Sequence, residues 1–302
     1  MTHRAAAPGA LDRRAFLKTA ALAAGLTVME PQAGAVEQVR NPRMELIDVN
    51  VNLSRWPSRS LRGEDTIALV AMLRRHGVVQ AWAGSFNGLL HKDIATVNAR
   101  LAEQCRRHGR GLLVPIGSIN PTLPDWEEEL RRCAEEHRMS GIRLHPNYHG
   151  YKLDAPAFAR LSRSAAERNL MVQLALAMED ERMMHPLLRV GPVDTAPLAD
   201  LVRQTAGLRL VLLNALAKLR GQPLVELVAA GEVYVDISML ESVGGVEKLL
   251  AEAQVNRVLF GSHAPLLYFD SALLKLKESP LNERQMEAIR SENARRLLAK
   301  KV

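Results

Sequence analysis

Polar residues interrupt several runs of the sequence that are otherwise strongly apolar. In ELIDVNVNL (45–53), Asp48, Asn50 and Asn52 stand at alternate positions, and in GIRLH (141–145) Arg143 and His145 do the same. Alternate residues of a β-strand point to one face, so each run is expected to present its polar side chains together. Carboxylates and imidazoles can move protons, whereas amides and guanidinium groups can hold the oxygens of a substrate. These residue types therefore indicate a site for a small polar molecule.

Further candidates stand at or just after the ends of other apolar runs. A guanidinium near a protein interior needs an acceptor, so Arg143 is expected either to form an ion pair with Asp48 or Asp236 or to contact the substrate. His263 and His145 both end strand-like runs, which makes each of them a candidate general base. The remaining candidates are Asn214, Asp236, Tyr148 and His149.

The elements that must position these residues alternate regularly from residue 44 onward. Eight short runs are apolar almost throughout, as strands buried on both faces of a parallel sheet are. They cover 44–51, 78–84, 111–119, 141–145, 170–177, 208–215, 233–238 and 257–262. Helix-like stretches between and after them cover 64–76, 91–108, 125–137, 155–168, 197–206, 222–230, 244–254 and 283–299.

This alternation predicts the fold. Eight strands, each followed by a helix within about 255 residues, predict a single α/β domain, a (β/α)8 TIM barrel over residues 44–302. A doubly wound sheet is the alternative, but the sequence has no Gly-rich phosphate loop. The site of such a barrel lies at the carboxyl ends of its strands, which is where the polar residues above are expected to meet.

Composition excludes some classes of function. The chain has 302 residues, 47% of them hydrophobic, and a formal charge of +7. Its basic residues are scattered over the expected helices rather than clustered, so a nucleic-acid partner is not expected. Cys105 and Cys133 lie on the apolar stripes of separate helices, and a disulfide between them is not expected.

The first 35 residues resemble an export signal. Arg13 and Arg14 precede Phe16, Leu17 and Lys18, and a short Ala-rich apolar run follows, which is the pattern of a twin-arginine signal peptide. The small residues at 33–35 place cleavage near residue 36. We therefore expect the twin-arginine export machinery as a partner and a periplasmic or extracellular location. No later run is long and apolar enough to span a bilayer, so no stable membrane insertion is expected after cleavage.

The chain resembles amidohydrolase-related proteins, a branch of the metal-dependent barrel hydrolases. The resemblance rests on ELIDVNVNL, GIRLHPNYHGYKLD, RVLFGSHAP and the closing SENARRLL, and it extends over about residues 44–300 together with the eight-fold alternation. It implies a barrel that performs hydrolysis, lactone opening or decarboxylation on a small-molecule substrate.

The metal ligands that this resemblance implies are replaced here. The family's His-x-His motif in the first strand corresponds to Asn50 and Asn52, and its later histidines to Ala175 and Asn214. His263 stands where the family has an aspartate. Amides are weak ligands, and zinc prefers His, Cys or carboxylate, so metal at the usual position is not expected.

Three functions stay open. The first is hydrolysis of a lactone, ester or amide bond without the usual metal site. A histidine would then be the general base, a carboxylate would orient it, and the guanidinium and amide groups would hold the substrate. The catalytic candidates are His263, His145, Asp236 and Asp48. The substrate-binding candidates are Arg143, Asn50, Asn52, Asn214, Tyr148 and His149.

The second function is a hydrolase with a divalent metal at a non-standard site, held by His145, His149, His263 and Asp236. The third is a ligand-binding protein of the same fold that has no catalytic activity. The sequence therefore predicts that no cofactor is needed, with a divalent metal at a non-standard site as the alternative.

Overall fold

The computed structural model describes residues 45–299. The predicted export signal, residues 1–35, lies outside the described residues, so the twin-arginine signal and the location beyond the inner membrane stay predictions. Within the described part of the chain, every helix is too short or too polar to cross a membrane.

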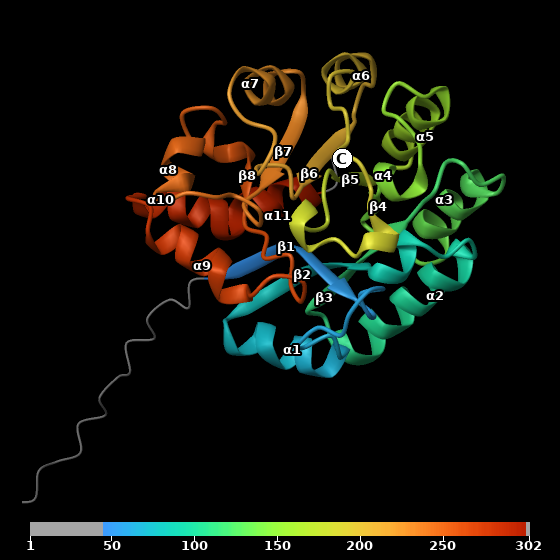
Figure 1. Cartoon of the computed structure of the whole chain (residues 1–302), viewed down its shortest axis with the longest axis horizontal. Coiled ribbons are helices and arrows are strands. Elements are labelled where there is room, and N and C mark those ends of the chain that lie inside the picture. Colours follow the sequence, from blue (N-terminus) through green and yellow to red (C-terminus); the bar gives the residue numbers. More distant parts are fainter. Residues whose placement is uncertain (1–44, 300–302) are drawn as a thin grey trace, which may run out of the picture. The chain divides into compact units, whose positions relative to one another are not determined.

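Eight parallel strands form one sheet in the order β1 to β8, which confirms the predicted (β/α)8 barrel (Figure 1). Their residues are buried along nearly their whole length, as the continuous apolar runs predict. The strands are β1 (Leu46–Leu53), β2 (Val78–Ser85), β3 (Leu113–Ser118), β4 (Gly141–Leu144), β5 (Met171–Ala175), β6 (Arg209–Leu213), β7 (Glu232–Asp236) and β8 (Val258–Leu259).

The barrel closes between its first and last strands. The backbone N–H of Val49 donates to the carbonyl of Phe260 at 3.0 Å, and that of Asn52 donates to the carbonyl of Ala264 at 2.9 Å. Val51 and Ala264 form a parallel bridge just beyond β8. These bonds leave the barrel without a free strand edge at this seam.

Helices surround the barrel and connect successive strands (Figure 1). Several begin at side-chain caps: Asp65 accepts from the backbone N–H groups of Ile67 and Ala68, and Asn282 forms a capping box with Gln285. The α-helices are α1 (Thr66–Arg75), α2 (Ile94–Gln104), α3 (Trp126–Glu135), α4 (Pro146–His149), α5 (Pro156–Glu167), α6 (Leu198–Gln204), α7 (Gln222–Ala229), α8 (Gly245–Leu249), α9 (Phe269–Lys277), α10 (Glu283–Glu287) and α11 (Asn293–Leu298).

Two apolar clusters fill the molecule. The outer cluster lies between the sheet and the helices and includes Val51, Ile142 and Leu212. The inner cluster fills the barrel and includes Val49 and Val211. Because side chains alternate along each strand, residues that flank members of the outer cluster point into the barrel, which is how Arg143 and Asp236 reach its interior.

Candidate functional site

The first strand is irregular where its polar residues lie. Its pairing with β2 shifts register between Asp48 and Val51, so the alternation of side chains changes there. Val49 packs in the inner cluster, whereas Val51 packs in the outer one. Asn50 and Asn52 therefore point into the barrel and Asp48 points away from it. The prediction that all three share one face is wrong for Asp48, because the irregularity turns two consecutive residues, Val49 and Asn50, inward.

Asp48 joins β1 to the end of β8. Its carboxylate accepts from the backbone N–H groups of Asn50 and Ser262, both at 3.0 Å, and from the Ser262 hydroxyl at 2.5 Å. Burial raises the pKa of Asp48 to about 7, although these hydrogen bonds oppose the shift. These contacts let Asp48 hold the strand that carries the amides, and its predicted catalytic role stays a prediction.

Arg143 crosses the barrel and supports the irregular stretch of β1. Its Nη1 donates to the Val51 carbonyl at 2.9 Å and to Asn52 Oδ1 at 2.7 Å. Its Nη2 donates to the carbonyls of Trp82 at 3.2 Å and Val49 at 3.5 Å. The fifth N–H, on Nε, donates to Gln173 Oε1 at 2.8 Å.

These bonds use every N–H of the guanidinium within the protein. Neither Asp48 nor Asp236 accepts from it, so neither predicted ion pair forms, and no donor is left for the predicted substrate contact. Burial lowers the pKa of Arg143 to about 10. Gly84 gives the side chain room, because a Cβ atom there would lie 2.6 Å from Nη1.

Asn50, Asn214 and Asp236 form one hydrogen-bonded group at the mouth of the barrel. Asn50 Nδ2 donates to Asn214 Oδ1 at 2.8 Å and to Asp236 Oδ2 at 2.7 Å. The backbone N–H of Asn214 donates to Asp236 Oδ1 at 2.9 Å, and the hydroxyl of Ser238 donates to Asn214 Oδ1 at 2.7 Å. Burial raises the pKa of Asp236 above its usual range. Within this group Asn50 Oδ1 is buried and has no partner.

His263 is buried, and both of its ring nitrogens face hydrogen-bonding groups. Nε2 lies 2.8 Å from the carbonyl of Met178, so Nε2 carries the proton and donates to it. Nδ1 then accepts from Asn52 Nδ2 at 3.4 Å. Burial lowers the pKa of His263 to about 4, so the ring is neutral at pH 7. In this arrangement His263 is a donor, and its lone pair is taken.

His145 is buried too, but its two ring nitrogens have no partner among the described residues. Burial first, and then His149, Arg143 and His263, hold its pKa well below the usual range. The ring of His149 lies 5.9 Å away, centroid to centroid, and its Nε2 lies 2.8 Å from the Gly88 carbonyl. His149 Nδ1 and the Tyr148 hydroxyl are buried without partners as well. Such polar atoms normally bind a ligand or ordered water.

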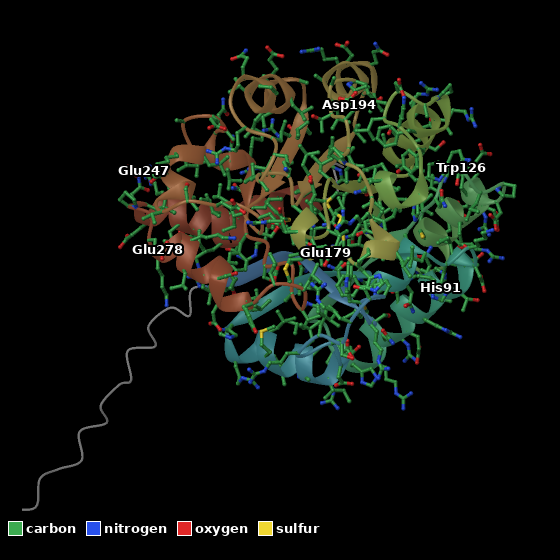
Figure 2. All side chains as sticks on the ribbon, in the orientation of Figure 1. His91, Trp126, Glu179, Asp194, Glu247 and Glu278 are labelled. Carbon is green, nitrogen blue, oxygen red and sulfur yellow. The ribbon has the colours of Figure 1, made fainter. Side chains whose placement is uncertain are left out.

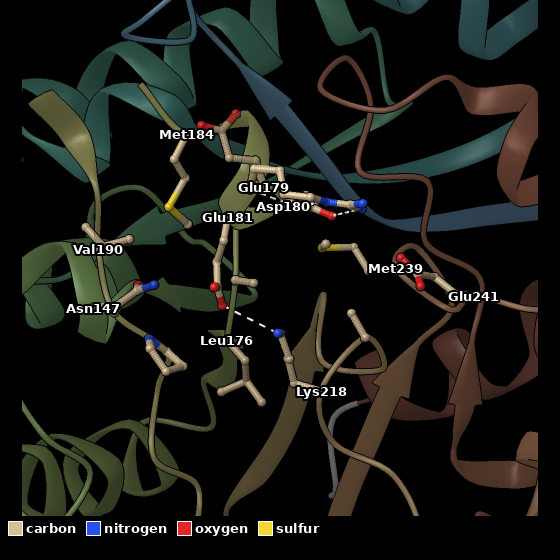
Figure 3. Close-up of a pocket in the computed structure, with 15 residues that line it drawn as sticks. Asn147, Leu176, Glu179, Asp180, Glu181, Met184, Val190, Lys218, Met239 and Glu241 are labelled. Atoms are coloured by element: carbon tan, nitrogen blue, oxygen red, sulfur yellow. Dashed lines mark hydrogen bonds and ion pairs between the residues drawn. The ribbon is translucent and has the colours of Figure 1, made fainter. Parts of the chain in front are cut away.

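A cavity of about 380 Å³ opens at the same end of the barrel. The loops after β5, β6 and β7 line it, and Figure 3 shows Glu181 and Lys218, which form an ion pair, on its wall. Glu179, also on its wall, lies over the centre of the barrel, whereas Glu247 and Glu278 lie at the periphery (Figure 2).

The structure brings most of the predicted residues together and adds others. Six of the predicted site residues lie in one network of hydrogen-bonding contacts: Asn50, Asn52, Arg143, Asn214, Asp236 and His263. Sequence reasoning did not assign roles to Gln173, Ser238 and Ser262, which hold these side chains in place. A glutamine inside the apolar run MVQLALA is the signal that could have found Gln173.

Several solved structures share this fold. A 5-carboxyvanillate decarboxylase from Sphingomonas paucimobilis is 14% identical with a TM-score of 0.65, covering 85% of this chain and 100% of that one. A dihydroxybenzoic acid decarboxylase from Polaromonas sp. JS666 is 15% identical with a TM-score of 0.64, covering 84% and 96%. A 5-carboxyvanillate decarboxylase from Novosphingobium aromaticivorans is 14% identical with a TM-score of 0.62, covering 84% and 95%. No curated protein sequence matches the chain.

The Polaromonas and Novosphingobium enzymes contain bound manganese. This finding contradicts the prediction that the chain needs no cofactor, which rested on the loss of the family's histidines at the usual metal position. Manganese is a hard cation that accepts carboxylate and amide oxygens. Asp236 and the amides of Asn50 and Asn214 carry such oxygens, but here Asn50 Nδ2, and not its Oδ1, faces Asn214 Oδ1 and Asp236 Oδ2. The three oxygens would face one cation only with the Asn50 amide turned over. The described residues contain no group of three or more His, Cys, Asp or Glu placed to hold a metal ion.

The sequence itself matches the amidohydrolase family over residues 58–300. The match begins after β1, so it covers seven of the eight strands and leaves out the strand that carries Asn50 and Asn52. It agrees with the barrel and with the resemblance found in the sequence. The chain belongs to the amidohydrolase family.

Proposed function

We propose that the protein is an enzyme that hydrolyses a C–O or C–N bond of a small molecule at the carboxyl end of its barrel. The observation that carries this proposal is His145, which is 1% exposed and has two ring nitrogens without partners. Leaving such a group buried and unsatisfied costs free energy unless a ligand or water bonds to it. Membership of a family of barrel hydrolases supports the same function.

His145 is the proposed general base. It is neutral at pH 7, because burial lowers its pKa, and it has a free lone pair, which His263 does not. In the reaction His145 takes a proton from a water whose oxygen attacks the acyl carbon. It then returns that proton to the leaving oxygen or nitrogen as the C–O or C–N bond breaks.

The other residues hold the substrate or orient the groups that bind it. Asp236 keeps the amides of Asn50 and Asn214 in place, and Arg143 does so for Asn52. The ring of His149 lies 5.9 Å from that of His145, and its Nδ1 is a free polar group for the substrate. The Tyr148 hydroxyl, in the same loop, is another. With the Asn50 amide turned over, Asp236, Asn50 and Asn214 would hold a divalent cation, with manganese favoured by the similar structures. When bound, such a cation polarises a carbonyl group or lowers the pKa of a water.

Decarboxylation of an aromatic acid is the second candidate, because the three similar structures above are decarboxylases. The barrel and the cavity at its mouth suit either reaction. The two reactions differ in their products, which are an acid with an alcohol or amine in one case and carbon dioxide in the other.

A substrate panel tests the proposal. Purified protein is assayed, with and without added manganese, on lactones, nitrophenyl esters, anilides and dihydroxybenzoates, and compared with His145→Gln. We expect hydrolysis by the wild type and a loss of about 10²-fold or more in the variant, the usual contribution of a general base. Carbon dioxide release from the benzoates alone would favour the second candidate. Equal activity of wild type and variant would contradict the role of His145.

A further inference from the structure

The group proposed to do the chemistry is closed off from solvent. His145 is 1% exposed, and it is not among the residues that line the 380 Å³ cavity at the mouth. A substrate therefore reaches it only if part of the chain moves. The segment that follows β5 extends across the mouth, with Glu179 over the centre of the barrel (Figure 2). We call residues 176–188 the cover segment.

The beginning of the cover segment is held by residues of the site itself. Asn214 Nδ2 donates to the carbonyl of Ala177 at 2.7 Å, and His263 Nε2 donates to that of Met178 at 2.8 Å. Arg59 forms an ion pair with Glu179 at 2.8 Å. Beyond these bonds most of the segment is exposed, although Met184 is buried, and Leu187 in its last turn is 90% exposed.

The two donors share an unusual backbone conformation. Asn214 directly follows β6, and His263 lies four residues beyond the end of β8. Both have positive φ angles, of 56° and 59° respectively. Residues other than glycine adopt this conformation at a cost, although Asn and His do so more readily than most. Here it aims both side chains at the same stretch of chain. The carbonyls that they bind belong to consecutive residues, Ala177 and Met178.

We propose that Asn214 and His263 are a binding site for two carbonyl oxygens of a ligand, and that the carbonyls of Ala177 and Met178 occupy this site until the ligand displaces them. This inference rests on the proposed function only in placing the substrate at this end of the barrel. The two hydrogen bonds that support the inference are made, in this structure, to the backbone carbonyls of Ala177 and Met178. The class of ligand follows from them: an acyl compound with two amide-like or ester-like carbonyl groups.

The charges around the pair favour an uncharged ligand. Asp236 accepts from the backbone N–H of Asn214, so its carboxylate lies beside the site. Arg143, the buried cation nearby, has no N–H left to pair with an anion. When no divalent cation is bound, a carboxylate ligand would therefore meet a negative neighbour without a cation to pair with, whereas a neutral diamide or ester would not be repelled.

Space for the displaced segment is available. The cavity at the mouth is lined by Ala177, Glu179 and Met184 of the cover segment and by Lys218 and Met239 of the loops after β6 and β7. Figure 3 shows Glu179, Met184, Lys218 and Met239 around it. Its volume of about 380 Å³ accommodates a shift of the segment without disturbing the strands.

Hydrogen exchange measured by mass spectrometry on the full chain tests the proposal. The probe is N-acetylglycinamide, which is uncharged and has two amide carbonyls, and acetamide with one carbonyl is the control at twice the concentration. We expect the probe to speed exchange in residues 177–188 about fivefold, as the loss of about one net hydrogen bond does. Acetamide should have a clearly smaller effect. No change with the probe, or equal effects of both compounds, would overturn the proposal.

A substitution tests the donors directly. Asn214→Asp keeps the size of the side chain and its tolerance of positive φ but removes the Nδ2 donor. We expect exchange of residues 177–188 to rise about fivefold without any probe, and the probe to add little. Asn169→Asp is the matched control, because Asn169 has a φ of 55° and bonds Arg209. Unchanged exchange in Asn214→Asp would overturn the proposal.

The exchange measurements and the substrate panel together separate this inference from the proposed function. If the cover segment responds to the probe but no acyl compound is hydrolysed, the binding site stands and the hydrolase proposal fails. If acyl compounds are hydrolysed and the segment does not respond, the hydrolase proposal stands and the binding site fails.

Discussion

Two regions of the barrel mouth treat their polar groups in opposite ways. Around β1, all five N–H groups of Arg143 donate within the protein, and both carboxylate oxygens of Asp48 accept hydrogen bonds. Around the end of β4, both nitrogens of His145, Nδ1 of His149 and the Tyr148 hydroxyl have no partner among residues 45–299. The polar groups of the first region fix the conformation of β1. Those of the second region are free to form hydrogen bonds with a ligand or water. The hydrogen-bond partners of a residue therefore distinguish a structural role from a catalytic one better than its residue type does.

The largest test of this comparison is Arg143→Met. Removal of the guanidinium leaves buried carbonyls on β1 and β2 without donors, so we expect the free energy of unfolding to fall by about 3–5 kcal/mol. Urea denaturation followed by circular dichroism measures it. Arg163→Met on the exposed face of α5 is the control, expected to change stability by less than about 0.5 kcal/mol. A loss of under about 1 kcal/mol at Arg143 would contradict its supporting role.

Gly84→Ala tests the same region from β2, the strand that pairs with β1. The new Cβ atom would lie 2.6 Å from Arg143 Nη1, so the guanidinium must move away from its acceptors. We expect a loss of about 1–3 kcal/mol in the free energy of unfolding, as for other overpacked sites. Gly191→Ala is the control, since a Cβ atom there meets nothing within 4 Å. Equal effects at the two glycines would show that Arg143 adapts freely.

The His145 region has its own signature in the pH dependence of stability. Because burial lowers the pKa of His145, the folded state binds fewer protons than the unfolded state at acid pH. Stability should therefore fall as the pH drops below about 6.5, with this one group contributing up to about 1.4 kcal/mol per pH unit.

His145→Gln removes that contribution, so its stability should depend less on pH in the acid range. Thermal unfolding between neutral and mildly acid pH measures the two slopes. His91→Gln is the matched control, because His91 is exposed, and it should keep the wild-type slope. A variant slope equal to that of the wild type would mean that His145 is protonated in the folded protein.

The smallest expected effect on stability comes from comparing a tyrosine hydroxyl that has no partner with one that is hydrogen-bonded. The Tyr151 hydroxyl is buried and has no partner in the part of the chain that the structure describes, whereas the Tyr234 hydroxyl donates to Glu232 at 2.7 Å. Tyr151→Phe should leave stability unchanged or raise it slightly, and Tyr234→Phe should lower it by about 1 kcal/mol. Chemical denaturation of both variants gives the comparison. A loss at Tyr151 as large as that at Tyr234 would indicate a partner, such as an ordered water, that the protein retains.

The fold could be predicted from the sequence because its signals are local. Apolar runs and amphipathic stretches gave the eight strands, and the helices expected at 64–76 and 155–168 appear as α1 and α5 within a few residues. The sequence did not predict α4 (Pro146–His149) or α9 (Phe269–Lys277). Both lack a side-chain cap, and α9 follows a long loop. The strand expected at 257–262 is shorter, because only Val258 and Leu259 pair with β7.

The site was less predictable because its geometry depends on exceptions to regular structure. The irregularity in β1 turned Asp48 away from Asn50, which a strict alternation cannot reveal. The positive φ angles of Asn214 and His263 aim side chains that strand periodicity alone would misplace. The sequence also listed two histidines as equal candidates for the base. Only the contacts of His263 with Met178 and Asn52 separate it from His145.

The seam between β1 and β8 couples the site to the solubility of the whole molecule. β1 carries the amides of the mouth, and its bonds to Phe260 and Ala264 also close the sheet. A truncation or a mispaired β1 would expose the edges of β2 and β8, and open edges invite pairing with other chains. Damage to this strand is therefore expected to appear first as aggregation, before any loss of ligand binding can be measured.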